Sequence, residues 1–276
     1  MQEDMTKDEK LLKLKSILKD MGHVVVAFSG GVDSTFLLKV AHDVLNDNVF
    51  AVLATSPTYP SREYSKAMEI VRQIGAKLRV IRTRELEDIT FNNNPVNRCY
   101  YCKSELFQKI SELAKKDGFG NMVDGSNYDD RSDYRPGMKA LKEKKVRSPL
   151  MEAGLTKKEI REFSKGMNLP TWEKDELACL SSRFPYGEKI TAEKLNMVDM
   201  VENLLSDLGF RNIRARHSKN TIRIEVDPGQ IYKFFDRDLR NRILRSVKQI
   251  GYTYVTIDLE GYRRGSMNEV LNSNTI

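Results

Sequence analysis

Cysteine, histidine and tryptophan are scarce in this chain, with three, three and one of them among 276 residues. Three cysteines are an odd number and too few for a disulfide framework, which a chain of this length does not need. No run approaches the roughly 18 uninterrupted apolar residues that a membrane-spanning helix requires. The first residues are acidic and lack the apolar core of a signal peptide, so we expect a soluble, cytoplasmic protein without a membrane partner.

Charge and hydrophobic content indicate a globular chain without a dedicated nucleic-acid surface. Hydrophobic residues make up 40% and charged residues 31% of the sequence, a balance that supports a buried core. The net charge is +7, but the excess is spread thinly along the chain. We therefore favour a solvated face together with pockets for phosphates, and not nucleic acid, as the reason for the basic balance.

Apolar, β-rich runs alternate with amphipathic stretches over the first 190 residues. The predicted strands are 23–28, 49–55, 77–81 and 121–123, and the predicted helices are 6–21, 35–45, 62–74 and 104–114. This alternation predicts an α/β domain at 1–190, in which helices cover a parallel sheet. Ligands of such sheets bind at the carboxyl ends of the strands.

The pattern changes near Thr191. The elements predicted there are a helix at 192–208, strands at 211–216 and 221–226, a helix at 230–249 and a strand at 252–257. This order predicts a small αββαβ domain, of the α+β class, at 191–276. The domain boundary is therefore expected between residues 190 and 191.

The loop between the first predicted strand and the next helix reads Ser-Gly-Gly-Val-Asp-Ser. Adjacent glycines let the backbone curl without a Cβ in the way, so that successive N–H groups and the following helix N-terminus converge on an anion. The hydroxyls of Ser29 and Ser34 add donors, and Asp33 is a candidate for binding magnesium or orienting the loop. These residues predict a phosphate site, for which an ordinary strand-to-helix turn is the alternative.

This loop lacks the Gly-Lys-Ser/Thr ending of a Walker loop and resembles the PP-loop of the ATP pyrophosphatases, which have a HUP-like fold. The resemblance implies that ATP is cleaved between its α and β phosphates and that AMP is transferred to the substrate. The predicted ATP-binding residues are Ser29, Gly30, Gly31, Val32, Asp33, Ser34, Asp124, Ser126 and Asn127. The last three follow a predicted strand, on the edge of the sheet that binds ligands.

The three cysteines allow three interpretations. A structural zinc needs a fourth ligand, for which His217 is the best candidate. A redox disulfide between Cys99 and Cys102 suits the CxxC spacing and leaves Cys179 as an unrelated thiol. An iron–sulfur cluster held by all three thiolates would leave one iron without a protein ligand, where hydrosulfide could bind.

Segments along nearly the whole chain together resemble the LarE family of ATP-dependent sulfur transferases. Besides the glycine loop they are NRCYYCK at 97–103, DGSNYDDRSDYRPG at 124–137, ACLSSRFPYG at 178–187, IRAR at 213–216, RIEVDP at 223–228 and DLEGYRRGSMNE at 258–269. The resemblance implies that ATP adenylates the carboxylates of pyridinium-3,5-biscarboxylic acid mononucleotide and that sulfur then displaces AMP. The product is a thiocarboxylate, and the pathway is the biosynthesis of the nickel-pincer nucleotide cofactor.

The cysteine pattern suggests the branch of the family. In one branch a single cysteine is sacrificed as sulfur donor, and Cys179 occupies that position. Other members carry an additional CxxC pair, as here with Cys99 and Cys102, and resemble enzymes in which a 4Fe-4S cluster carries the sulfide. The resemblance therefore implies cluster ligation by the three cysteines, with an external sulfide donor as partner.

Two arginines complete the predicted catalytic set of Asp33, Cys179, Arg214 and Arg216. Arg214 and Arg216 take alternate positions of one predicted strand, so their side chains share a face and could clamp the phosphate or carboxylates of the substrate. They resemble the paired arginines of the family, and a solvated basic strand face is the alternative. Arg183 and Arg135 are further candidates for the same task.

Two other functions compete with the sulfur insertase. A tRNA-thiolating PP-loop enzyme would also use three cysteines, but it should carry an RNA-binding module, often with zinc-ribbon cysteines, and we see neither. A protein that only senses adenine nucleotides would not need the cysteines. A homo-oligomer is compatible with the sequence.

Overall fold

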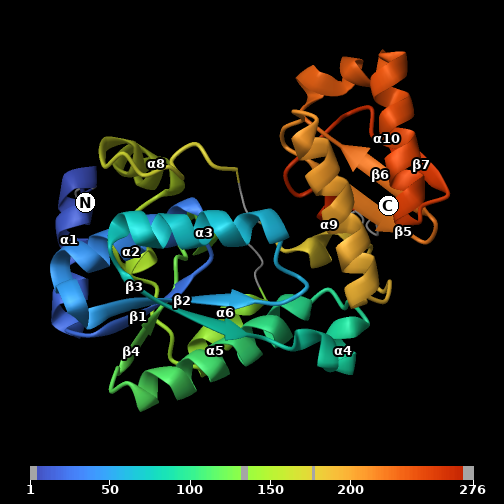
Figure 1. Ribbon diagram of the computed structural model, residues 1–276. Helices are drawn as coiled ribbons and strands as arrows, with labels where there is room; N and C mark the ends of the chain where they lie inside the picture. Colours follow the sequence, from blue (N-terminus) through green and yellow to red (C-terminus); the bar gives the residue numbers. More distant parts are fainter. Residues whose placement is uncertain (1–4, 132–135, 176–177, 270–276) are drawn as a thin grey trace. The chain divides into compact units, whose positions relative to one another are not determined.

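The computed structural model describes residues 5–131, 136–175 and 178–269. By its internal contacts the chain falls into two compact units, whose elements Figure 1 labels. The first unit comprises Met1–Ser56, Arg62–Glu85 and Asn97–Leu177, and the second comprises Pro57–Ser61, Leu86–Val96 and Ala178–Ile276. The domain boundary between residues 190 and 191 stays a prediction.

Four parallel strands form the sheet of the first unit, in the order β3-β2-β1-β4. They are β1 (Val24–Phe28), β2 (Val49–Thr55), β3 (Lys77–Arg82) and β4 (Asn121–Val123). The central strands β1 and β2 are almost entirely buried, as their apolar runs without alternation predict. This parallel sheet with its helices confirms the predicted α/β class.

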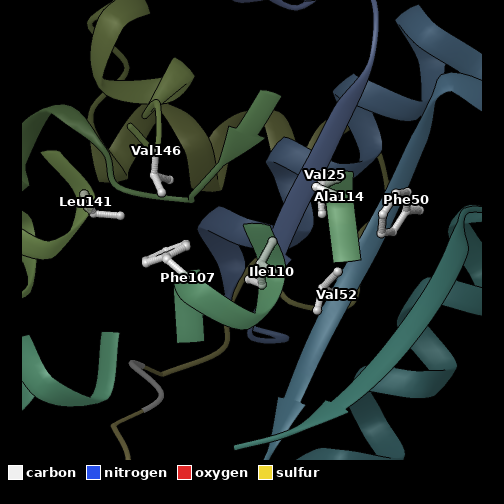
Figure 2. Close-up of a cluster of buried hydrophobic side chains, with 8 residues drawn as sticks. All are labelled: Val25, Phe50, Val52, Phe107, Ile110, Ala114, Leu141 and Val146. Carbon is white, nitrogen blue, oxygen red and sulfur yellow. The ribbon is translucent and has the colours of Figure 1, made fainter. Parts of the chain in front are cut away.

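Helices cover this sheet (Figure 1). In the first unit they are α1 (Lys7–Met21), α2 (Val32–Leu45), α3 (Ser61–Ile74), α5 (Arg98–Lys116), α6 (Gly137–Glu143), α7 (Pro149–Ala153) and α8 (Lys157–Gly166). Figure 2 shows how α5 packs: Phe107, Ile110 and Ala114 meet Val25 of β1 and side chains of β2. This apolar contact fixes α5 against the strand that leads into the glycine loop.

Several helices of the first unit differ from the prediction. The helix predicted at 104–114 is longer, because α5 begins at Arg98 and includes the CxxC pair at its start. Helices α6, α7 and α8 were not predicted, although Thr156 and Glu159 form a capping box at the start of α8. A capping box of Thr6 and Glu9 also opens α1.

From Ala192 onward the second unit has the predicted αββαβ order. These elements are α9 (Ala192–Asp207), β5 (Arg214–Ser218), β6 (Thr221–Glu225), α10 (Arg237–Ile250) and β7 (Tyr254–Ile257), and the unit also contains the unpredicted α4 (Ile89–Asn92). Strand β6 lies in the middle of the sheet, antiparallel to β5 and parallel to β7. The single helix predicted at 230–249 is wrong: a 3-10 helix covers Pro228–Phe235, and Asp236 caps α10 by accepting a hydrogen bond from the Leu239 N–H at 2.7 Å. Over the described ranges, no helix has the length and apolar content to cross a membrane.

Candidate functional site

The glycine loop joins β1 to α2, as predicted. Gly30 has a φ of 71°, in the left-handed region that favours glycine, and Gly31 is the N-cap of α2. The Oγ of Ser34 donates to the Gly31 carbonyl at 3.3 Å and lies 3.1 Å from the Oγ of Ser29. The two serines therefore close the loop around its glycines, at the carboxyl end of a central strand.

Asp33 lies in the first turn of α2 and is bound on both carboxylate oxygens. The ammonium of Lys157 forms an ion pair with Oδ2, and Nδ2 of Asn127 donates to Oδ1 at 3.4 Å. Burial raises the pKa of Asp33, and the charge of Lys157 opposes that shift. The structure thus brings two of the predicted ATP-binding residues together, and it adds a lysine.

Residues 124–127 lie against the same helix turn. A Cβ on Gly125 would lie 2.9 Å from the backbone nitrogen of Ser34 and 3.1 Å from its Cα. The buried carboxylate of Asp124 accepts hydrogen bonds from the hydroxyls of Ser126 and Ser148, both at 2.6 Å. The two loops predicted to bind ATP therefore meet at one edge of the sheet.

This close approach gives a first prediction. Replacing Gly125 with alanine is expected to lower kcat/KM for ATP by about 10²-fold, because the new Cβ must push the Ser34 backbone away and a displacement near 1 Å has that effect. The matched control is Gly120→Ala, since a Cβ on Gly120 meets no atom within 4 Å. Equal ATP kinetics for the two variants would show that the contact with α2 has no role in binding.

Lys174 also contacts the glycine loop, and the sequence did not predict it. Its Nζ donates to the carbonyl of Gly30 at 2.8 Å and pairs with Glu63 at 2.5 Å. The carbonyl and the following N–H of a trans peptide point in opposite directions, so this bond turns the N–H of Gly31 away from the lysine. Arg161 holds the Lys174 backbone by donating to its carbonyl at 2.8 Å. Lys174 therefore sets the orientation of the peptide between the two glycines.

The CxxC pair lies on the first turn of α5. Cys99 and Cys102 are three residues apart on a helix, so their side chains lie on the same side. Cys99 is exposed, Cys102 is partly exposed, and neither forms a disulfide. The next residue, Lys103, places its Nζ 3.8 Å from the carboxylate of Asp124. This lysine ties the CxxC turn to the loop at 124–127.

Cys179 belongs to the second unit, where a buried ion pair supports it. Arg183 is 3% exposed and binds both carboxylate oxygens of Glu202, at 2.8 and 2.9 Å. The same guanidinium donates to the carbonyls of Ala178 and Cys179 at 3.1 and 3.2 Å. Glu202 also accepts a hydrogen bond from the backbone of Ala215 at 2.9 Å. The pair therefore holds the backbone beneath an exposed thiol against β5.

Arg214 and Arg216 alternate on β5 with the buried Ala215 between them, so they share a face as predicted. Arg216 binds both carboxylate oxygens of the buried Glu225 at 2.9 Å. It also donates to the carbonyl of Ser182 at 2.8 Å. Arg216 thus attaches the segment that follows Cys179 to the strand.

Arg214 has a different environment. Its guanidinium lies over the ring of Tyr262, 4.7 Å from the centroid. Burial lowers the pKa of Arg214, and the positive charge of Arg183 lowers it further. The carboxylate of Glu202 opposes this effect. The fourth predicted arginine, Arg135, lies outside the described residues.

Related sequences identify the family of this chain. The NAD synthase family matches residues 7–103, which include both the glycine loop and the CxxC turn. An uncharacterized protein of Synechocystis is 42% identical over 264 residues, 96% of this chain and 98% of its own. The pyridinium-3,5-bisthiocarboxylic acid mononucleotide synthase of Lactiplantibacillus plantarum is 38% identical over 263 residues, 95% of each chain. The chain belongs to the LarE family.

ATP and magnesium are the cofactors that this family implies. The residues at the LarE glycine loop fit them in chemical type: glycines without a Cβ, two serine hydroxyls and one aspartate carboxylate. The lysines around the loop supply the positive charge that the motif lacks. Family membership thus supports an ATP-dependent enzyme that transfers sulfur.

The 4Fe-4S cluster of this LarE chain stays a prediction. Thiolates one helical turn apart are a suitable donor pair for an iron–sulfur cluster. Within the described ranges, however, no group of three or more histidine, cysteine or acidic side chains could hold a metal. Cys99 and Cys102 belong to the first unit and Cys179 to the second, so the convergence of the three thiols stays a prediction.

Several charged residues that contact the predicted site residues of either unit were missed by the sequence reasoning. They are Lys103, Lys157, Lys174 and Glu202. Lysine and glutamate are common on solvated helix faces, and the partners of three of them, Asp33, Asp124 and Gly30, lie at least 20 positions away in the sequence. Only Lys103 carried a signal, because it directly follows the CxxC pair.

Proposed function

We propose that this chain is an ATP-dependent sulfur insertase. It adenylates the carboxylates of pyridinium-3,5-biscarboxylic acid mononucleotide and replaces oxygen with sulfur, in the biosynthesis of the nickel-pincer nucleotide cofactor. The relative from L. plantarum is named for the bisthiocarboxylic product and aligns with 95% of this chain. The structural observation that carries the proposal is the contact between the loop at 124–127 and both the glycine loop and the CxxC helix.

Adenylation supplies the leaving group that the reaction needs. A carboxylate oxygen leaves poorly, whereas AMP leaves well, so ATP must act before sulfur can enter. In this proposal the hydroxyls of Ser29 and Ser34 and the N–H groups of the glycine loop bind the pyrophosphate end of ATP. Asp33 would hold the magnesium ion, and Asp124, Ser126 and Asn127 would position the nucleotide at the adjoining loop.

The second unit would hold the acidic substrate. We assign Arg214 to the phosphate or a carboxylate of the mononucleotide, because its guanidinium is half-buried and is influenced by the positive charge of Arg183. Arg216 belongs to the same catalytic set through its bond to the Ser182 carbonyl, which positions the chain next to Cys179. The two arginines then serve one site from one face of β5.

Sulfur delivery is assigned to the cysteines. Cys99, Cys102 and Cys179 would hold a 4Fe-4S cluster, which supplies an open iron for a sulfide that an external donor provides. The second candidate is sacrifice of Cys179, and its exposure to solvent favours that reading. In both cases the reacting sulfur enters a small nucleotide and no nucleic acid takes part.

Anaerobic purification tests the cluster. The protein is expected to be brown and to contain about four irons per chain. Incubation with ATP, magnesium, sulfide and the biscarboxylic mononucleotide should then convert the substrate to its thiocarboxylate, and the intact mass of the chain should stay unchanged. A colourless, zinc-containing protein contradicts the cluster, and a chain that loses the mass of hydrogen sulfide supports sacrifice of Cys179. An unmodified mononucleotide contradicts the sulfur insertase itself.

A further inference from the structure

Lys157 occupies the carboxylate of Asp33, which magnesium would need, and it is also a cation that the phosphates of ATP would need. Its ammonium is paired with Asp33, the acidic residue of the glycine loop, while Asn127 takes the other carboxylate oxygen. A magnesium ion that binds Asp33 must therefore compete with this lysine. The loop itself contains no cation, although the triphosphate of ATP carries several negative charges.

The lysine has a fixed backbone and a movable side chain. Lys157 is the first residue of α8, directly after the capping residue Thr156, and its N–H donates to Asp129 at 2.9 Å. The ammonium is carried on a flexible four-carbon stem, and the side chain is 24% exposed. A change of partner therefore requires only side-chain rotation.

The negative charges around Asp33 favour a cation next to its carboxylate. Asp130 is buried, accepts a hydrogen bond from the Asn127 N–H at 3.0 Å, and adds its negative charge to that of Asp33. Two carboxylates in a partly buried site repel each other unless a positive charge lies nearby. Lys157 supplies that charge in this structure, and a divalent ion would supply more.

We propose that Lys157 exchanges partners when ATP binds. Its ammonium, which here pairs with Asp33, would bind the pyrophosphate end of ATP, and the Asp33 carboxylate would then hold magnesium. This inference rests on the proposed function only in taking ATP as the ligand of the loop. It makes Lys157 a phosphate-binding residue and a barrier to metal binding without nucleotide.

The first test measures metal binding without nucleotide. Mn²⁺ titration followed by electron paramagnetic resonance should show weak binding to the unaltered protein and binding at least ~10-fold tighter to Lys157→Met, since a competing cation has been removed. The matched control is Lys158→Met, because Lys158 is the next residue and is exposed. Equal Mn²⁺ affinity in all three proteins contradicts the barrier role.

The second test measures the phosphate role with pyrophosphate alone. Calorimetry should show that Lys157→Met weakens pyrophosphate binding by about 10-fold to 10²-fold, the loss expected for a charge-assisted hydrogen bond. AMP affinity should stay unchanged, and Lys157→Arg should recover most of the pyrophosphate affinity. Unchanged pyrophosphate affinity in Lys157→Met overturns the proposal.

A double variant distinguishes a change in binding from a loss of folding. Lys157→Met leaves Asp33 without its ion-pair partner, whereas Asp33→Asn combined with Lys157→Met removes both charges. The double variant should bind pyrophosphate as weakly as Lys157→Met and should lose the tight Mn²⁺ binding. Tight Mn²⁺ binding in the double variant would show that Asp33 is not the ligand and would contradict the exchange.

These binding tests separate the inference from the proposed function. Pyrophosphate and Mn²⁺ report on the glycine loop without any sulfur chemistry. If the affinities for pyrophosphate and Mn²⁺ change in Lys157→Met as expected but no thiocarboxylate forms from the mononucleotide, the proposed sulfur insertion is wrong and the partner exchange is supported. If thiocarboxylate forms and neither affinity changes in Lys157→Met, the partner exchange is wrong.

Discussion

Replacing Glu202 with glutamine is expected to destabilise the second unit by about 3–5 kcal/mol, because it leaves the charge of Arg183 buried without its carboxylate. Arg183 is 3% exposed and Glu202 accepts both of its ion-pair bonds. The loss of stability should extend to the segment around Cys179, because the carbonyls of Ala178 and Cys179 accept hydrogen bonds from the same guanidinium. Hydrogen exchange read by mass spectrometry should show faster opening of β5 and of the turn at 180–183.

The matched control for this variant is Glu260→Gln. Glu260 pairs with Arg263 in the same unit, but its side chain is 68% exposed, so its loss should change the free energy of unfolding by at most ~1 kcal/mol. Similar exchange rates in the two variants would show that the buried pair does not support the Cys179 segment. Hydrogen exchange is preferred to a single unfolding curve because the chain has two compact units.

Replacing Cys99 with serine is expected to reduce thiocarboxylate formation on the order of 10³-fold, the scale of loss when one member of a reacting group is removed. Release of pyrophosphate should continue up to one adenylate per site, because Cys99 is not among the residues assigned to ATP, whereas AMP should stay bound to the substrate until sulfur displaces it. Product mass spectrometry and pyrophosphate analysis on the same sample measure both quantities. The anaerobically purified variant should also lose its brown colour.

This variant distinguishes the two sources of sulfur. If Cys179 were sacrificed, Cys99→Ser would still give one sulfur atom per chain, whereas Cys179→Ser would give none. Ser104→Ala, two residues after the CxxC pair on α5, serves as the control and should retain full activity. One turnover in Cys99→Ser, with loss of hydrogen sulfide from the chain, would contradict the assignment of the CxxC pair.

The sequence predicted the central elements well because burial leaves a clear pattern. Strands β1 and β2 lie in the middle of a parallel sheet and are apolar on both faces. The glycine loop must curl between strand and helix, and only glycine does this without strain at Gly30. Residue types that burial or backbone conformation requires at a position therefore predicted the sheet and the glycine loop.

Other features could not be read from the sequence. The first turn of α5 carries no apolar stripe, because Cys99 is exposed and the residues from Tyr100 to Leu106 are only partly buried, so the predicted helix began too late. The 3-10 helix before α10 continues an apolar pattern, and only the cap at Asp236 divides the two. Lys157 and Lys174 meet the glycine loop from positions more than a hundred residues away. Long-range ion pairs of this kind form only in the folded chain.

The central claim is that ATP adenylates the substrate before sulfur enters. ATP labelled in its α phosphate should be incubated anaerobically with the protein, magnesium, sulfide and the biscarboxylic mononucleotide, and the nucleotide products separated by chromatography. The account predicts labelled AMP together with pyrophosphate, formed only when the mononucleotide is present and in proportion to the thiocarboxylate. Labelled ADP with inorganic phosphate, or AMP formed without the mononucleotide, would contradict it.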